Sequence, residues 1–214
     1  MAAPRRVRLP LDERRAQLLA LGIRLFSTHS YDDISIDDVA AQAGISKGLL
    51  YHYFQGKREF YVEVIREASL QLRRLTAPDP TIPPAARLRA AVEAHLNFVE
   101  AHGAVYAAIY RSGVAISTEV TAILEEHREV VMQYLLRDLR VTRPRPALRA
   151  ALRAWIAMME GASLDLAGHP EVGRETVTEL VIAGYGALLA RAASLDPRTA
   201  RSLEKVLRRG PDAY

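Results

Sequence analysis

The chain has 214 residues, of which 50% are hydrophobic and 25% are charged, with a formal net charge of +4. This composition is typical of a globular protein of one or two domains. The chain has no cysteine, which excludes disulfides, thiol nucleophiles and zinc–thiolate sites. We expect a cytoplasmic protein with no signal peptide and no membrane span, because residues 1–10 lack an apolar core and no apolar run approaches membrane-spanning length.

The excess of basic residues lies mainly in the N-terminal third. Residues 1–77 hold 12 Lys and Arg against 9 Asp and Glu, whereas residues 78–214 hold 17 against 16. Residues 1–10 form a basic arm that we expect to be flexible. Arg5, Arg6 and Arg8 of this arm either contact DNA phosphates or the minor groove, or remain part of a solvated tail.

The first three predicted helices lie close together. Residues 12–28 form the first, with an apolar stripe at helical spacing. Ser35 and Asp38 have the spacing of a capping box, so a second helix begins there. Gly44 then provides a tight turn, and Ser46 caps a third helix that runs to Phe54. Two short helices joined by such a turn form a helix-turn-helix.

The third helix has two different faces. Leu50 and Phe54 are four residues apart and share the buried side. The outer side carries a cation, a glycine and two hydrogen-bonding rings, namely Lys47, Gly48, Tyr51 and His52. A helix with these groups can enter a major groove and contact phosphates and base edges. Lys57, which begins the next helix, can hold another phosphate.

From Arg14 to about Ile65 the chain resembles the DNA-binding domain of the TetR family of bacterial transcriptional regulators. The matching residues occur at fixed spacing, and they are Leu25, Phe26, Tyr31, Asp32, Ser35, Ile36, Val39, Ala40, Ala43, Gly44, Ile45, Ser46, Lys47, Gly48, Leu50, Tyr51, Tyr53, Phe54 and Lys57. The resemblance implies an all-α protein with a three-helix DNA-binding domain at 11–56, a connecting helix at 57–77 and a larger helical ligand-binding and dimerisation domain at 85–214.

The resemblance also implies roles for eight residues. Those matching positions that hold phosphates are Ser35, Ser46, Tyr51, Tyr53 and Lys57. Those facing the groove, where bases are read, are Lys47, Gly48 and His52. Tyr53 stands where the family often has histidine, although either ring can donate a hydrogen bond to a phosphate.

Beyond the proline-rich break at 78–84 every predicted element is a helix. The expected ranges are 85–102, 104–110, 118–140, 147–167, 174–194 and 196–209. Gly103 is the interruption between the first two of these. In the resembled family the last two main helices, here 147–167 and 174–194, form a four-helix dimer interface. A monomeric bundle is the alternative, but only a two-fold dimer presents two recognition helices to two half-sites.

The resemblance further implies a ligand pocket inside the second domain. Phe98, His102, Tyr106 and Tyr110 are spaced four apart and share one face if their helix is unbroken. His127, Trp155 and Met159 lie on the helices expected to face them. Aromatic and methionine walls suit a mostly apolar small molecule. For each of these residues, ordinary core packing is the alternative.

We find no motif for catalysis, metal binding or a cofactor, so none is expected. The sequence predicts a dimeric repressor that binds a palindromic operator and is released by a small, mostly apolar inducer. One alternative is a helix-turn-helix regulator without an inducer, either constitutive or controlled by a protein partner. A second alternative, an enzyme built on a helical bundle, is disfavoured by the missing motifs.

Overall fold

The computed structural model describes residues 11–111 and 118–207, without the side chains of residues 11, 84–85, 104–105, 108–111 and 205–207. Within these ranges every regular element is helical, which confirms the all-α prediction. The elements are α1 (Leu11–Phe26), α2 (Ile36–Ala43), α3 (Lys47–Tyr53), α4 (Lys57–Leu75), α5 (Pro84–Arg111), α6 (Thr118–Asp138), α7 (Pro146–Gly168), the short 3-10 helix η2 (Pro170–Val172), α8 (Arg174–Leu195) and α9 (Pro197–Leu207).

The predicted caps of the helix-turn-helix are present. Ser35 accepts a hydrogen bond from the Asp38 N–H, and the Asp38 carboxylate accepts one from the Ser35 N–H, which completes the capping box. Gly44 ends α2 in the left-handed region with φ of 64°, where glycine carries no Cβ penalty. Ser46 then accepts a hydrogen bond from the Leu49 N–H and caps α3.

The first three helices and α4 share one hydrophobic core. Phe54 at the end of α3 packs edge-on against Phe60 of α4, with ring centroids 5.0 Å apart. Gly22 lets α1 approach α4 closely, because a Cβ there would lie 2.3 Å from Val64 Cγ2. This core also contains three buried residues from beyond the proline-rich break, namely Phe98, Val120 and Ile123.

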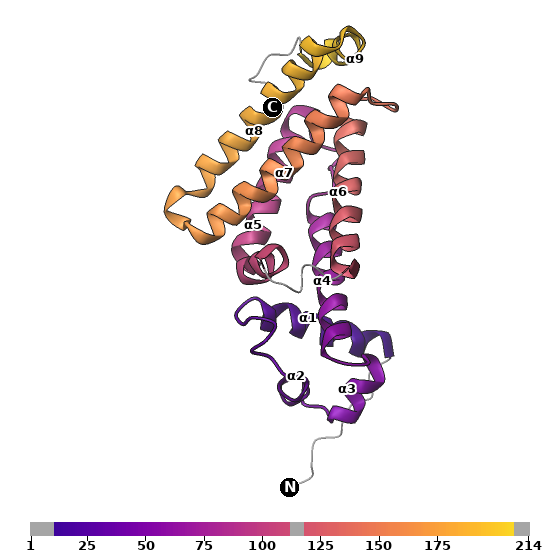
Figure 1. The fold of residues 1–214 in the computed structure, drawn as a ribbon, viewed down its shortest axis with the longest axis vertical. Helices are drawn as coiled ribbons and strands as arrows, with labels where there is room; N and C mark the ends of the chain where they lie inside the picture. The colour runs from indigo at the N-terminus through magenta and orange to yellow at the C-terminus, as the bar shows by residue number, and fades with distance from the viewer. Residues whose placement is uncertain (1–10, 112–117, 208–214) are drawn as a thin grey trace.

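A second core lies among α5, α6, α7, α8 and α9. The α7 and α8 helices pack along one another at one edge of the molecule (Figure 1). Between them the Trp155 indole N–H donates to the Val181 carbonyl at 2.8 Å, and the Trp155 ring packs edge-on against Tyr185. The α4 helix rises from the helix-turn-helix and packs against α5 and α6 (Figure 1).

The expected interruption near Gly103 is confirmed, one residue earlier. The α5 helix bends at His102, whose φ of −131° and ψ of 27° are non-helical, and then continues to Arg111. The premise of an unbroken face from Phe98 to Tyr110 therefore does not hold, because the bend changes the direction of the residues that follow it.

The expectation that no segment approaches membrane-spanning character is wrong for α8. By length and composition alone this helix could cross a membrane. The core helix of a soluble protein passes the same test, and Val177, Val181, Tyr185 and Leu189 of α8 are buried in the second core.

Candidate DNA-binding surface and internal cavity

The outer face of α3 is accessible along its length. Lys47, Gly48, Tyr51 and His52 are exposed, whereas Leu50 is fully buried. A Cβ built on Gly48 would meet nothing within 4 Å, so the backbone at the start of α3 is open to a close partner. The predicted groove face is therefore solvent-exposed in the described chain, and its one ion pair to another helix joins Lys47 to Asp37 of α2.

Leu49 is a residue of this face that the sequence reasoning did not assign. Its side chain is 40% exposed. It lies one helical step from Gly48 and three residues before His52, so it borders both on the outer surface. The spacing of the sequence could have indicated this exposure. Leu50 lies four residues before the buried Phe54 and shares its side of the helix, whereas Leu49 does not.

Lys47 is engaged in the free protein. Its ammonium nitrogen lies 2.9 Å from Asp37 Oδ2, and this contact raises the pKa of Lys47. Both side chains are more than half exposed, so the ion pair contributes little to stability. A phosphate can therefore compete with Asp37 for Lys47.

Lys57 is held in place by aromatic packing. Its nitrogen lies 4.3 Å from the centroid of the Tyr31 ring, a cation–π arrangement. Tyr53, half-buried, packs edge-on against His52 with centroids 5.6 Å apart. These contacts orient two of the predicted phosphate residues, Tyr53 and Lys57, beside the groove face of α3.

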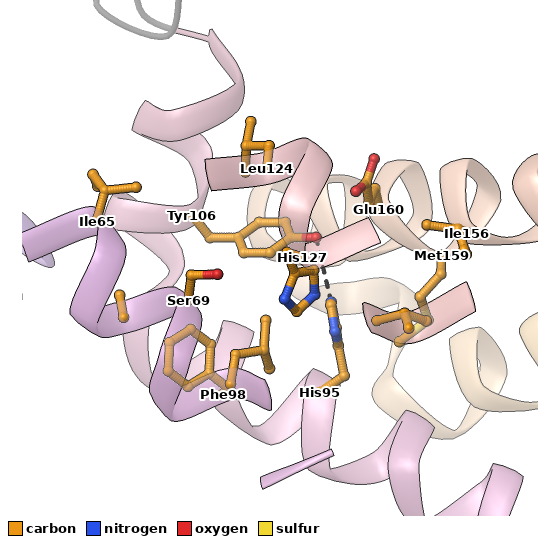
Figure 2. Close-up of a pocket in the computed structure, with 13 residues that line it drawn as sticks. Ile65, Ser69, His95, Phe98, Tyr106, Leu124, His127, Ile156, Met159 and Glu160 are labelled. Carbon is orange, nitrogen blue, oxygen red and sulfur yellow. Dashed lines mark hydrogen bonds between the residues drawn. The ribbon is translucent and has the colours of Figure 1, made fainter. Parts of the chain in front are cut away.

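A cavity of about 60 Å³ lies between α4, α5, α6 and α7 (Figure 2). Its described lining is mostly apolar and consists of Ile65, Ala68, Ser69, Leu72, His95, Phe98, Tyr106, Leu124, His127, Val131, Ile156, Met159 and Glu160. Four of the predicted pocket residues are among them, namely Phe98, Tyr106, His127 and Met159. Phe98 and Met159 also belong to the first and the second hydrophobic core, respectively.

The other predicted pocket residues lie elsewhere. Trp155 lines a second cavity of about 70 Å³, which shares His95, Val131 and Met159 with the first. His102 is turned toward the DNA-binding helices, with Nδ1 3.2 Å from the Ser27 hydroxyl just after α1. The side chain of Tyr110 lies outside the described residues.

The polar groups of the first cavity are largely uncharged. His95 Nε2 lies 3.3 Å from the Tyr106 hydroxyl. Burial lowers the pKa of His95 to about 3 and that of His127 to about 4, so both rings are neutral near pH 7. The Glu160 carboxylate receives two hydrogen bonds from Arg128, each of 2.8 Å. Sequence reasoning missed Ser69 and His95 as lining residues, because the side of a helix that faces a cavity depends on tertiary packing.

The described residues contain no group of three His, Asp or Glu side chains placed to hold a metal ion.

The fold and the exposed helix define a class of protein. An all-α chain whose helix-turn-helix exposes its second helix belongs to the DNA-binding regulators. The family model for bacterial regulatory proteins of the tetR family matches residues 18–64. The tetracyclin repressor-like C-terminal domain model matches residues 84–203. The chain belongs to the TetR family and is a DNA-binding transcriptional regulator rather than an enzyme.

Relatives of known sequence or structure agree with this assignment. A tetR-family regulator from Streptomyces coelicolor is 34% identical, with a TM-score of 0.86 over 94% of this chain and 90% of that one. The HTH-type transcriptional activator FasR of Mycolicibacterium smegmatis is 36% identical over 117 residues, 54% of this chain and 53% of FasR. An uncharacterized HTH-type regulator of Mycobacterium tuberculosis is 26% identical over 60% of this chain and 64% of its own length. The chain thus aligns with between half and two thirds of these two curated relatives.

Proposed function

We propose that the protein is a homodimeric repressor that binds an operator of two inverted half-sites and is released by a small, mostly apolar ligand. The observation that carries this proposal is that two different surfaces, one on α3 and one on α7 and α8, are left exposed. In the described chain the groove face of α3 is exposed, and α7 and α8 leave small and apolar side chains exposed. Figure 1 places α3 at one end of the molecule and the α7–α8 pair along another edge.

The dimer is supported by the small and apolar residues that α7 and α8 leave exposed. On α7 these are Ala150, Ala154, Ala157 and Gly161, and on α8 they are Leu180, Ala183 and Ala187. Leu180 is 63% exposed. Small residues let a second pair of helices approach closely, and a closed two-fold interface uses the same face on both copies. Leu180→Glu is expected to give a monomer by light scattering and to weaken operator binding.

On DNA, we assign phosphate contacts to Ser35, Ser46, Tyr51, Tyr53 and Lys57. Lys47, Gly48 and His52 face the bases. We add Leu49 to this second group, because an exposed aliphatic side chain beside an open glycine matches the 5-methyl group of thymine in a major groove. Two such helices, one per subunit, fit half-sites about 34 Å apart.

Ligand control is supported by the part that α4 takes in the cavity wall. Ile65, Ala68, Ser69 and Leu72 all belong to α4, and α4 begins four residues after the end of α3. The cavity of about 60 Å³ is smaller than most ligands, so uptake has to move its walls. Moving α4 changes the spacing of the two recognition helices. A ligand that favours the released shape by about 1.4 kcal/mol lowers operator affinity tenfold.

Activation is the second candidate, because FasR is named an activator. A regulator without an inducer, constitutive or controlled by a protein partner, is the third. A transcription assay on the natural promoter separates repression from activation. A thermal-shift screen for compounds that both stabilise the fold and change DNA binding separates the third candidate from the first two.

The first test is selection of bound DNA from a random-sequence library with the purified protein and no ligand. An enriched inverted repeat supports a dimeric reader, and its genomic matches identify the promoters for the transcription assay. No enrichment at low salt, where phosphate contacts are strongest, would refute binding by the ligand-free dimer.

A further inference from the structure

Two residues that line the first cavity each carry a buried polar atom without a partner among the described residues. These atoms are Oγ of Ser69 on α4 and Nδ1 of His127 on α6. The His127 residue is only 8% exposed. Figure 2 shows the Ser69 hydroxyl and the His127 ring turned toward each other from two sides of the cavity. Because leaving a buried donor or acceptor unpaired is costly, such a pair marks a place where a partner binds.

The same cavity offers no free charge in its described lining. His95 and His127 are neutral near pH 7, since burial lowers the pKa of both. Glu160 is neutralised by two hydrogen bonds from Arg128. Arg73 of α4 lies outside the lining and is bound to Glu126 at 2.8 Å. An ammonium group placed in the cavity would therefore be buried without a free counter-charge. A carboxylate would lie near Arg73 and Arg128, which are already paired with Glu126 and Glu160, and would have to displace one of these carboxylates to gain a counter-charge.

We propose that the ligand is an uncharged, mostly apolar molecule with one oxygen function, a hydroxyl or a carbonyl, that hydrogen-bonds to Ser69 Oγ and His127 Nδ1. The inference rests on the proposed ligand-controlled function and specifies the chemistry of its effector. A serine hydroxyl rotates to donate or accept, and a neutral imidazole nitrogen does either according to its tautomer. Both oxygen functions are therefore accommodated.

The position of Ser69 gives the hydrogen bond a regulatory consequence. Ser69 belongs to α4, so the ligand oxygen acts directly on the helix that leads to α3. The apolar body of the ligand extends toward Met159, which lines both this cavity and the one of about 70 Å³ beside Trp155. Methionine is flexible, so its displacement joins the two cavities.

The test uses four probes with the same carbon count: hexanol, 2-hexanone, hexanoate and hexylammonium. Binding is followed by fluorescence of Trp155, the single tryptophan of the chain, and by thermal shift. We expect the alcohol and the ketone to bind at least about tenfold more tightly than either ion. Ser69→Ala and His127→Phe should each reduce this affinity by about fivefold. His127→Leu replaces His127→Phe if phenylalanine prevents folding.

Thr178→Val is the matched control, because Thr178 Oγ1 on α8 is also buried without a partner in the described part of the chain, and Thr178 lines neither cavity. This variant should bind the probes as the unaltered protein does. Equal or tighter binding of an ion, no binding of any probe, or an unchanged preference in both cavity variants would each overturn the inference. Operator binding without probes is measured on the same samples. Its loss would count against the proposed function, whereas intact operator binding with the wrong probe preference refutes only the ligand class.

Discussion

Lys47 lies on the groove face of α3, but in the free protein its ammonium group is bound to Asp37. DNA binding therefore requires an exchange of a carboxylate for a phosphate at this residue. The exposed carboxylate of Asp37 also adds a negative charge close to the expected path of the DNA backbone. Both effects oppose binding, so Asp37 reduces the affinity that Lys47 could otherwise provide.

We expect Asp37→Asn to bind the selected operator about two- to fivefold more tightly, which corresponds to the ~0.5–1 kcal/mol typical of an exposed ion pair. Fluorescence anisotropy titrations at several salt concentrations measure the change. Asp165→Asn on α7, an exposed residue remote from α3, controls for net charge and should have a smaller effect. Weaker binding by Asp37→Asn would mean that Asp37 instead holds Lys47 in its binding conformation.

Leu49 gives a prediction that can be tested on the DNA itself. Replacing one thymine of the selected half-site by uracil removes only the 5-methyl group. At the contacted position we expect this change to weaken binding by about threefold to tenfold, the value of one buried methyl group. Leu49→Ala should bind the thymine and uracil operators equally, because the aliphatic contact is gone. An equal loss on uracil substitution in both proteins would assign the methyl contact to another residue.

The sequence predicted the helix caps of the helix-turn-helix better than it predicted which residues of α3 are exposed. Ser35, Asp38 and Ser46 could be assigned because capping depends on residues within one turn of each other. The exposure of Leu49 depends on the tilt of α3 against α1 and α4, which no local pattern specifies. His102 was grouped with Phe98 and Tyr106 for the same reason: its φ and ψ depart from the helix, and spacing alone does not reveal that.

At the scale of the element, the end of α6 shows a strained residue. Arg140 was predicted to be the last residue of a helix, but α6 ends at Asp138 and Arg140 has a φ of 57°. The Val141 N–H donates to the Leu136 carbonyl at 2.9 Å, which is the hydrogen bond of a left-handed helix end. Glycine usually occupies this position because a Cβ is unfavourable there.

We therefore expect Arg140→Gly to stabilise the protein by about 0.5–1 kcal/mol. Urea or thermal unfolding measures the difference. Arg137→Gly in the last turn of α6 is the matched control, and it should destabilise by about 1 kcal/mol because residue 137 is helical. A stability loss in both variants would mean that the Arg140 side chain makes a contact worth more than its backbone strain.

Helix positions were predicted within about two residues because apolar periodicity and breakers are local signals. The interruption of α5 was predicted from Gly103, but the direction of the helix beyond it was not, because that direction depends on tertiary packing. At that bend the Ser27 hydroxyl lies 3.2 Å from His102 Nδ1, and the Phe98 ring packs on the His102 ring at 4.6 Å. Phe98 also lines the cavity. The bend in α5 thus links the cavity to the end of α1.

For the whole molecule, the proline-rich break separates the chain in sequence but not in packing. Phe98, Val120 and Ile123 belong to the core of the DNA-binding helices. Two ion pairs also join α4 to α6, Arg58 with Glu119 at 2.9 Å and Arg73 with Glu126 at 2.8 Å. Long-range contacts of this kind are invisible to a pattern search. They make α4 part of both halves, as the proposed coupling between cavity and DNA requires.

The two buried histidines make the stability of the whole fold depend on pH. Burial lowers the pKa of His95 to about 3 and that of His127 to about 4, from an ordinary value of 6.5. At pH values between the lowered pKa of each histidine and 6.5, the unfolded chain binds protons that the folded chain does not. The free energy of unfolding should therefore fall as the pH drops below about 6.5, by up to about 1.4 kcal/mol per pH unit for each histidine.

Urea unfolding at neutral pH and at several values down to about 4.5 measures this slope. The interval ends above the ordinary value of Asp, 3.8, and at that of Glu, 4.5, so the carboxylates with lowered pKa lose most of their contribution at lower pH. His127→Phe should reduce the slope by about half, because one of the two buried titrating groups is removed. His52→Ala, which removes an exposed histidine, should leave it unchanged. A flat profile in the unaltered protein would show that both imidazoles gain protons as easily in the folded chain as in the unfolded one, and hence that water reaches the cavity.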